Sequence, residues 1–272
     1  MKNIIILTGD EVRHKYFRIM LAKNKNINVL KSYCEDDSKS LENRVFTNYQ
    51  SSALEKLHVI SRKQSEKDYF LDAYENIKDK SKPKIIEKGS INNNEITNNI
   101  IDLNPDLIIC YGSSLIKSDL LEIYKNKFLN VHLGLSPYYR GSGTNVWPLI
   151  NYEPHMVGAT FMYIDKGIDT GKIIHQIRAK IQLGDNPHTI GNRLIKDMVI
   201  TYINIINYFD SLQAEEQPKN IGKFYKKSDF IENSCKILYK NISSNMLEDY
   251  INVSKNNDYP YIVNNKALST LK

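Results

Sequence analysis

The chain has 272 residues, of which 41% are hydrophobic and 25% are charged, as expected for a globular protein with a full core. Its net charge of +6 is small and its lysines are spread along the sequence, which disfavours a nucleic-acid binder with a basic stripe. No apolar run is long enough to span a bilayer or to form a signal peptide, so we expect a cytoplasmic protein with neither nucleic-acid nor membrane partners.

The first third of the chain predicts strands alternating with helices. An isoleucine-rich run over residues 3–7 closes in a Gly-Asp turn, a pattern typical of a buried parallel strand. The apolar spacing that follows predicts a helix, with Asp10 as its expected N-cap. A second strand is expected over residues 28–33 and a second helix over residues 65–78, whereas residues 35–49 show no clear pattern.

The alternation is clearer in the middle of the chain. Strands are predicted over residues 84–87, 107–111 and 128–132, with helices over residues 94–103 and 118–124 between them. This spacing indicates βαβ units, and therefore an α/β, Rossmann-like, mostly parallel twisted sheet flanked by helices. Because parallel crossovers are right-handed, the carboxyl ends of the strands meet at one edge, where ligands bind in open α/β sheets.

Two more strands and a long helix are predicted after this point. The strand-like runs over residues 157–164 and 172–181 are joined by a short turn, so we expect them to pair antiparallel at an edge of the sheet. The longest helix should begin at Pro187, with Asp185 or Asn186 as its N-cap.

The pattern breaks near residue 214, which predicts two regions. We expect a catalytic domain over residues 1–213 and a short C-terminal extension over residues 214–272. The extension should hold one or two short helices and a strand pair near residues 259–263.

Three polar residues could carry chemistry. Asn130 and His132 are two residues apart on a predicted strand, so their side chains share a face, and Asp169 follows the next strand. Acyl transfer to an amine needs donors for the oxyanion of a tetrahedral intermediate and a group that removes the amine proton. Asn130 can donate, and His132 can donate or accept. Asp169 can orient the imidazole, hold a proton-relay water, or raise the pKa of the histidine as a nearby negative charge. No Ser or Cys nucleophile lies beside them, so direct attack by a substrate amine fits best.

Each of these residues also has a structural explanation when it is taken alone. An Asn or an Asp at a strand end often closes a turn, and a His there is often held by hydrogen bonds. We expect Ser142, Thr144 and Asn145 mainly to cap the following short helix, and Trp147 to lie in the core. The three cysteines are widely spaced and predict packing residues, with no disulfide and no metal site.

The combination of motifs resembles a known family. An N-x-H strand end at Asn130 and His132 is followed by a Ser-Pro loop ending in Tyr139-Arg140-Gly141, and then by the DKGIDTG turn that contains Asp169. In this order the sequence resembles the folate-dependent formyltransferases, which include glycinamide ribonucleotide, methionyl-tRNA and sugar N-formyltransferases. The resemblance is strongest over residues 107–176 and absent after about residue 210. It implies a formyltransferase fold that moves a formyl group from N10-formyltetrahydrofolate to an amine.

The resemblance also implies roles for individual residues. Asn130, His132 and Asp169 would be the catalytic set, with Asn130 as oxyanion donor and His132 as acid and base. The formyl-folate would contact two loops, at Ser114, Leu115, Ile116, Lys117, Leu121, Ile164, Asp165, Gly167 and Ile168. The amine substrate would contact Gly9, Asp10, Arg13, His14, Ser136, Tyr138, Tyr139 and Arg140. Arg13 and His14 either meet a phosphate or sugar at a helix N-terminus or form a solvated first turn.

The substrate is the least determined part of the hypothesis. The turn after the first strand lacks the glycine-rich phosphate loop of the glycinamide ribonucleotide enzyme, and the tail lacks the basic barrel of the tRNA enzyme. The loop GLSPYYRGSGTN looks most like formyltransferases of surface-polysaccharide loci. We therefore expect the 3- or 4-amino group of a nucleotide-linked amino-deoxy sugar used in lipopolysaccharide O-antigen synthesis, and a homodimer. A methionyl-tRNA formyltransferase with a reduced C-terminal domain, a glycinamide ribonucleotide formyltransferase-like enzyme and a catalytically silent folate-binding protein stay open as alternatives.

Overall fold

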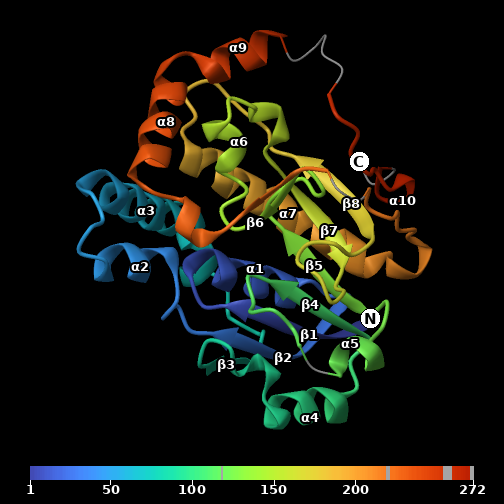
Figure 1. The fold of residues 1–272 in the computed structure, drawn as a ribbon. Coiled ribbons are helices and arrows are strands. Elements are labelled where there is room, and N and C mark those ends of the chain that lie inside the picture. Colours follow the sequence, from blue (N-terminus) through green and yellow to red (C-terminus); the bar gives the residue numbers. More distant parts are fainter. Residues whose placement is uncertain (118, 219–220, 254–258, 270–272) are drawn as a thin grey trace.

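The centre of the fold is a seven-stranded sheet with the strand order β3-β2-β1-β4-β5-β7-β8 (Figure 1). It is seen in a computed structural model that describes residues 1–117, 119–218, 221–253 and 259–269. The strands are β1 (Lys2–Gly9), β2 (Ile27–Glu35), β3 (Pro83–Ile86), β4 (Leu107–Tyr111), β5 (Phe128–His132), β7 (Gly158–Tyr163) and β8 (Ile173–Arg178). Neighbours from β3 to β5 are parallel, and β7 is antiparallel to both β5 and β8. The predicted mostly parallel sheet and its antiparallel strand pair are therefore confirmed.

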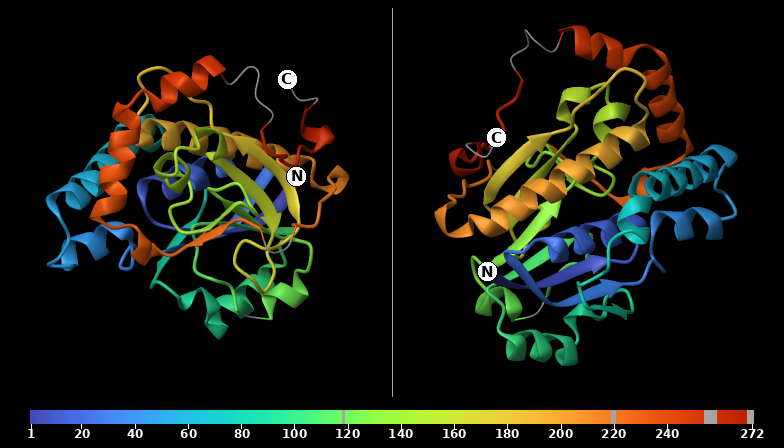
Figure 2. Two further views of the ribbon diagram at one scale, coloured as in Figure 1. Left: turned by 45° about the horizontal axis from the view of Figure 1, so that its top comes forward. Right: turned by 180° about the vertical axis from the view of Figure 1, so that it is seen from behind.

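Helices cover both faces of the sheet because the buried strands are apolar on both sides. The helices on the two faces are α1 (Val12–Lys23), α3 (Ala53–Glu75), α7 (Pro187–Asn207), α4 (Asn94–Leu103) and α5 (Leu120–Ile123). Ile4 and Ile6 of β1 face the core that contains α1, α3 and α7, whereas Ile5 and Leu7 face the core with α4 and α5. Figure 1 shows α4 and α5 below the sheet. The view from behind in Figure 2 (right) shows the long α7 crossing the opposite face.

Helix starts agree with the sequence in part. Asn186 caps α7 by accepting hydrogen bonds from the backbone N–H groups of His188 (2.9 Å) and Thr189 (3.1 Å), as predicted. The predicted cap of α1 is wrong, because β1 extends to Gly9, Asp10 belongs to the turn and Glu11 takes the N-cap position. The predicted start of α5 at residue 118 lies outside the described residues.

Two helical segments are missing from the sequence prediction. Helix α3 begins at Ala53 and is capped by Ser52, well before the predicted start, because the exposed side chains of Leu57 and Ile60 blur its apolar period. Helix α2 (Leu41–Thr47) has one buried side chain, so it leaves almost no periodic signal.

The C-terminal residues lie over the half of the sheet that contains β5, β7 and β8 (Figure 1). They form β9 (Lys223–Tyr225), α8 (Glu232–Ser243), α9 (Met246–Val253) and α10 (Lys266–Ser269), and α8 packs against α6 (Trp147–Ile150). Single-turn 3-10 helices lie at Ser90–Asn92, Pro154–Met156, Phe209–Ser211 and Lys227–Asp229. The predicted strand pair near residues 259–263 is wrong, since Val263 instead binds the backbone and side chain of Gln176 on β8 (2.8 and 2.9 Å).

A ten-residue segment, residues 221–230, is called the C-terminal strap below. Its strand β9 pairs in parallel with β6 (Tyr139–Gly141), in the loop that follows β5 (Figure 1). Tyr225 stacks on Trp147 with ring centroids 4.3 Å apart, so Trp147 lies in the core as predicted. The strap therefore holds the loop that leads away from the predicted catalytic strand.

Two simpler expectations also concern the core and the surface. Cys34, Cys110 and Cys235 are free and buried, which confirms that they are packing residues. In the part of the chain that the structure describes, no helix has the length and apolar character to cross a membrane.

Candidate active site

A cavity of about 620 Å³ opens at the carboxyl ends of the parallel strands. Gly9, Glu35, Tyr111 and His132 end β1, β2, β4 and β5, and all four line it. This is the edge at which the sequence places the ligand, because parallel strands present their carboxyl ends together. The cavity is large enough for a drug-sized molecule.

His132 lies in this cavity with hydrogen-bond acceptors at both ring nitrogens. Its Nδ1 is 3.3 Å from Asp169 Oδ2. Its Nε2 is 3.0 Å from the carbonyl oxygen of Tyr139 and 3.1 Å from Thr144 Oγ1. The side chain is 8% exposed, so these contacts hold the ring with one edge toward the cavity.

Asp169 is fixed from its backbone and from its carboxylate. It has a φ of +54°, and its carbonyl oxygen accepts a hydrogen bond from Gln217 Nε2 (3.1 Å). Its Oδ2 accepts a hydrogen bond from the backbone N–H of Gly141 (3.0 Å). Within the same turn, Asp165 Oδ1 accepts from Thr170 Oγ1 (2.7 Å). The carboxylate that faces His132 is thus held in one orientation.

Thr144 is a site residue that the sequence assigned to a different role. The N-cap of α6 is Val146 and receives no side-chain hydrogen bond, so the predicted capping by the three polar residues before it is wrong. Thr144 Oγ1 instead donates to the carbonyl of Leu133 (2.7 Å) and lies against His132 Nε2. Gly134 allows this approach, since a Cβ there would lie 2.5 Å from Nε2.

Asn130 lines the cavity beside His132. Among the described residues, no group makes a hydrogen bond with its side-chain amide. The amide is therefore available to donate to a bound molecule.

The loops expected to hold the folate meet at the cavity. Leu115 and Ile168 are 44% and 47% exposed there, so two apolar side chains on facing loops offer a surface for a flat ring. Ser114, Ile116, Ile164, Asp165 and Gly167 line the cavity as well. Lys117 and Leu121 lie outside the lining, and the Lys117 backbone N–H instead donates to Asn92 (2.7 Å).

The residues expected to contact the amine substrate divide into two groups. Gly9, Asp10, Arg13 and His14 line the cavity, whereas Ser136, Tyr138, Tyr139 and Arg140 lie outside its lining. Ser136 is fully buried, and its carbonyl accepts from Gln176 Nε2 (2.8 Å). The hydroxyls of Tyr138 and Tyr139 donate to the Tyr261 carbonyl (3.3 Å) and the Glu153 carboxylate. Ser136 and the two tyrosines thus hold the loop that follows His132, whereas the Nε of Arg140 is buried without a hydrogen-bond partner among the described residues.

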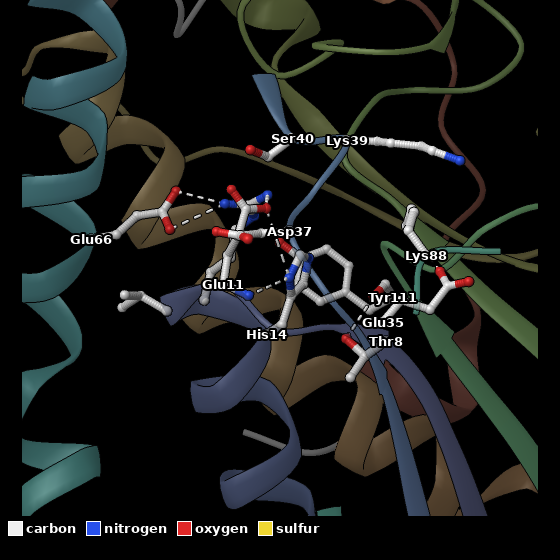
Figure 3. A network of polar contacts seen from close by, with 12 residues as sticks. Thr8, Glu11, His14, Glu35, Asp37, Lys39, Ser40, Glu66, Lys88 and Tyr111 are labelled. Carbon is white, nitrogen blue, oxygen red and sulfur yellow. Dashed lines mark hydrogen bonds and ion pairs between the residues drawn. The ribbon is translucent and has the colours of Figure 1, made fainter. Parts of the chain in front are cut away.

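Arg13 is part of a balanced charge cluster, of which Figure 3 labels Glu11, His14 and Glu66. Its guanidinium binds the carboxylates of Glu66 (3.0 Å) and Glu11, and Glu11 also pairs with Arg62 (3.0 Å). Burial would raise the pKa of Glu11, but the guanidinium groups of Arg13 and Arg62 hold that pKa well below its usual range. Burial also holds the pKa of His14 well below its usual range, and its Nδ1 accepts from the Glu11 N–H (3.3 Å). A phosphate at the start of α1 would thus compete with carboxylates already in place.

Glu35 links the loops around the cavity. It is fully buried and accepts hydrogen bonds from Lys88 Nζ (2.8 Å) and from the backbone N–H groups of Gly89 (2.8 Å) and Ser114 (2.6 Å). A carboxylate at the end of an apolar strand run could have been picked out from the sequence, because strand ends meet at this edge.

Other lining residues give no such signal in the sequence. They come from the loop after β2, from helices and from the strap, and they include Lys39, His58, Arg62, His188, Lys226, Lys227 and Phe230. Their place in the cavity depends on long-range packing, which no local pattern records.

Comparison with known proteins identifies similar sequences. Residues 25–206 match the family model described as Formyl transferase. The chain is 33% identical to the methionyl-tRNA formyltransferase of Desulforamulus reducens over 138 residues, which are 50% of this chain and 43% of that protein. The chain therefore spans about half the length of the curated relatives it matches.

Solved structures share the fold at lower identity. A 4-N formyltransferase from Francisella tularensis superposes with a TM-score of 0.54 at 20% identity, covering 88% of this chain and 86% of that chain. WlaRD, a sugar 3N-formyl transferase solved in the presence of dTDP and 5-N-formyl-THF, gives a TM-score of 0.51 at 21% identity. That match covers 85% of this chain and 72% of the other.

Proposed function

Because the match over residues 25–206 places the chain in the formyl transferase family, we propose that it moves a formyl group from N10-formyltetrahydrofolate to an amine. The acceptor in this proposal is the primary amine of a nucleotide-linked amino-deoxy sugar. The observation that carries it is the arrangement of His132 at 3.3 Å from Asp169, with the unpaired amide of Asn130 beside it in the cavity.

Each of the three residues has a part in acyl transfer. The Asn130 amide donates a hydrogen bond to the formyl oxygen, where negative charge develops as the amine attacks. His132 takes the proton that the attacking nitrogen loses and returns it to the departing nitrogen. Asp169, whose carboxylate accepts a hydrogen bond from the Gly141 N–H, keeps the His132 imidazole in one orientation. The amine itself is the nucleophile, so no covalent acyl-enzyme is formed.

The cavity suits the formyl donor. The exposed apolar side chains of Leu115 and Ile168 pack against the faces of the pterin ring, while Ser114 and Asp165 lie at its polar edge. The bound folate supplies a formyl carbonyl attached to a nitrogen that can leave. WlaRD was solved with 5-N-formyl-THF, which supports a folate donor for a protein of this fold.

A nucleotide-linked sugar is the preferred acceptor. The loop GLSPYYRGSGTN resembles that of polysaccharide-locus formyltransferases, and the cavity presents both lysines and aspartates that suit phosphates and hydroxyls. WlaRD was solved with dTDP, which supports a nucleotide substrate for a protein of this fold. In this proposal the formylated sugar is used in the synthesis of lipopolysaccharide O-antigen.

Methionyl-tRNA is the second candidate acceptor. The first two curated relatives, each 33% identical to the chain over the matched residues, are methionyl-tRNA formyltransferases. A tRNA substrate would need phosphate contacts over a wide surface and would bind with a steep salt dependence.

The test is an assay with formyl-folate and a panel of acceptors. The panel holds 3-amino and 4-amino deoxy sugars linked to UDP, dTDP and GDP, with charged initiator tRNA as the competing acceptor. We expect mass spectrometry to detect a formylated amino sugar. Turnover of the tRNA without formylation of any sugar would contradict the proposal. The homodimer and the cytoplasmic location are separate proposals, checked by light scattering and by cell fractionation.

A further inference from the structure

The cavity holds several cations, and half of them are already neutralised. These paired cations are Arg13 and Arg62 with Glu11 and Glu66, and Lys88 with the buried Glu35. An incoming anion would have to displace a carboxylate from each of them, so they are poor anion sites.

Three lysines on the same cavity remain unpaired. In the described part of the chain, no carboxylate lies within ion-pair distance of Lys39, Lys226 or Lys227. Lys39 follows β2, and Figure 3 shows its side chain extending away from the cluster around Glu11 and Glu66. Lys226 and Lys227 belong to the C-terminal strap.

The strap and the loop after β2 meet at these lysines. Lys227 Nζ donates to the backbone carbonyl of Lys39 (3.1 Å), although the two residues are far apart in sequence. Burial lowers the pKa of Lys227, and the nearby charge of Lys88 lowers it further. The more distant carboxylate of Glu11 offsets part of this lowering. Positive groups are thus gathered with no carboxylate in ion-pair contact among the described residues, and a bound anion would relieve their repulsion.

Carboxylates at the strand ends line the same wall of the cavity as these lysines. Asp10, Asp36 and Asp37 also line the cavity, after β1 and β2. Burial raises the pKa of Asp10, and Asp37 contributes to this rise. Carboxylates accept hydrogen bonds from hydroxyl groups, so the wall suits a ligand that carries phosphates and sugar hydroxyls together.

We propose that Lys39, Lys226 and Lys227 bind the diphosphate of the substrate, which makes the C-terminal strap a substrate-binding element. This inference rests on the proposed function, since it assigns a place to the nucleotide part of the same substrate. Lysine is a common phosphate ligand as a mobile point charge. The sugar then extends from the lysines toward Asn130 and His132 along one cavity.

The test is a calorimetric titration of the full chain with UDP, dTDP and GDP. We expect Lys39→Ala, Lys226→Ala and Lys227→Ala each to weaken binding of the best diphosphate about tenfold, the loss of one charge-assisted contact. Lys227→Arg should bind within about threefold of the wild type, because it keeps the charge. Lys223→Ala is the matched control: Lys223 lies on the same strap, is exposed and does not line the cavity. It should leave binding unchanged within about twofold.

Two results would overturn the inference. The first is unchanged binding in all three alanine variants, and the second is an absence of binding of every diphosphate to the wild type. The titration needs no formyl transfer, so it separates this inference from the proposed function. Lysine-dependent diphosphate binding supports the inference even where the sugar assay is negative, whereas sugar formylation with unchanged binding in the variants overturns the inference alone.

Discussion

His132 is positioned by groups that all accept hydrogen bonds. The Tyr139 carbonyl can only accept, and Thr144 Oγ1 uses its own hydrogen on Leu133, so His132 Nε2 donates to both. Asp169 Oδ2 faces the other nitrogen. The imidazolium form therefore has an acceptor for each of its N–H groups, as suits the proposed role of His132 as the group that receives a proton.

Removing the imidazole tests this role. His132→Ala should lower kcat by about 10²- to 10⁴-fold, the usual contribution of a positioned acid–base group. Steady-state kinetics with the formylated acceptor measures the change, and circular dichroism checks the fold. A kcat close to that of the wild type would remove His132 from the mechanism.

Thr144 should act through His132. Thr144→Val keeps the shape but removes the hydroxyl that contacts Nε2, so we expect kcat to fall about tenfold with little change in KM. The pH profile of kcat should shift as well, because the ring loses one hydrogen-bond partner. Thr144→Ser keeps the hydroxyl and should restore both. If the Val and Ser variants behave alike, the hydroxyl has no part in positioning His132.

Sequence reasoning found some of these residues and missed others for a physical reason. Asn130 and His132 lie near the carboxyl end of a parallel strand, so their place at the cavity edge could be predicted. Asp169 follows β7, which is antiparallel to β5, so its contact with His132 depends on how the turn after β7 folds back. Thr144 sits in a glycine-rich loop whose path depends on the absence of a Cβ at Gly134. Ser, Thr and Asn before a helix usually cap it, and here tertiary packing overrides that preference.

At the level of elements, Glu35 joins three parts of the cavity edge. It ends β2, it holds the loop after β3 through Lys88 and Gly89, and it holds the loop after β4 through Ser114. The last of these loops carries Leu115, on the expected folate surface. A single buried carboxylate thus sets the distance between the loops.

Glu35→Gln should disturb both stability and folate binding. The amide leaves the charge of Lys88 without a partner, and breaking a buried pair costs about 3–5 kcal/mol. We expect a lower midpoint in urea and a higher KM for formyl-folate. Glu95→Gln is the control, since Glu95 makes an exposed ion pair with Lys84 (3.0 Å) and should change stability by less than about 1 kcal/mol. Equal effects of the two variants would contradict the role of Glu35.

Helices and strands could be predicted from the sequence where their side chains are buried in a regular pattern. The strands β4 and β5 and the helix α4 have the predicted bounds, because the two strands are buried on both faces and the helix on one. Helix α2 and the start of α3 lie over the cavity edge with exposed apolar side chains, so their pattern is not that of a surface helix. The strap and β9 pair with a distant loop, and such pairing leaves no local pattern.

At the scale of the whole molecule, buried histidines make the fold sensitive to acid. Burial lowers the pKa of His58 to about 3 and the pKa of His175 and His188 to about 4. The same residues in the unfolded chain titrate near pH 6.5. The unfolded state therefore holds more protons than the folded state between these values, and it gains stability as the pH falls.

We expect the free energy of unfolding to fall as the pH is lowered from about 6.5 to about 4, by up to roughly 1.4 kcal/mol per pH unit for each of these histidines. Calorimetric melting across this range measures the fall in Tm. His58→Gln should reduce the slope, because one buried base is removed. A Tm that stays constant down to pH 4.5 would contradict the prediction.

The pairing of the strap with β6 has a consequence for synthesis of the protein. A chain leaves the ribosome from its N-terminus, so the sheet and α7 can assemble before residues 223–225 have been translated. Until then β6 has no partner strand, and the N–H of Gly141 that holds Asp169 is not yet anchored. The contact of Asp169 with Gly141 thus gains the support of β9 only once the strap has emerged, and truncated translation products would lack that support.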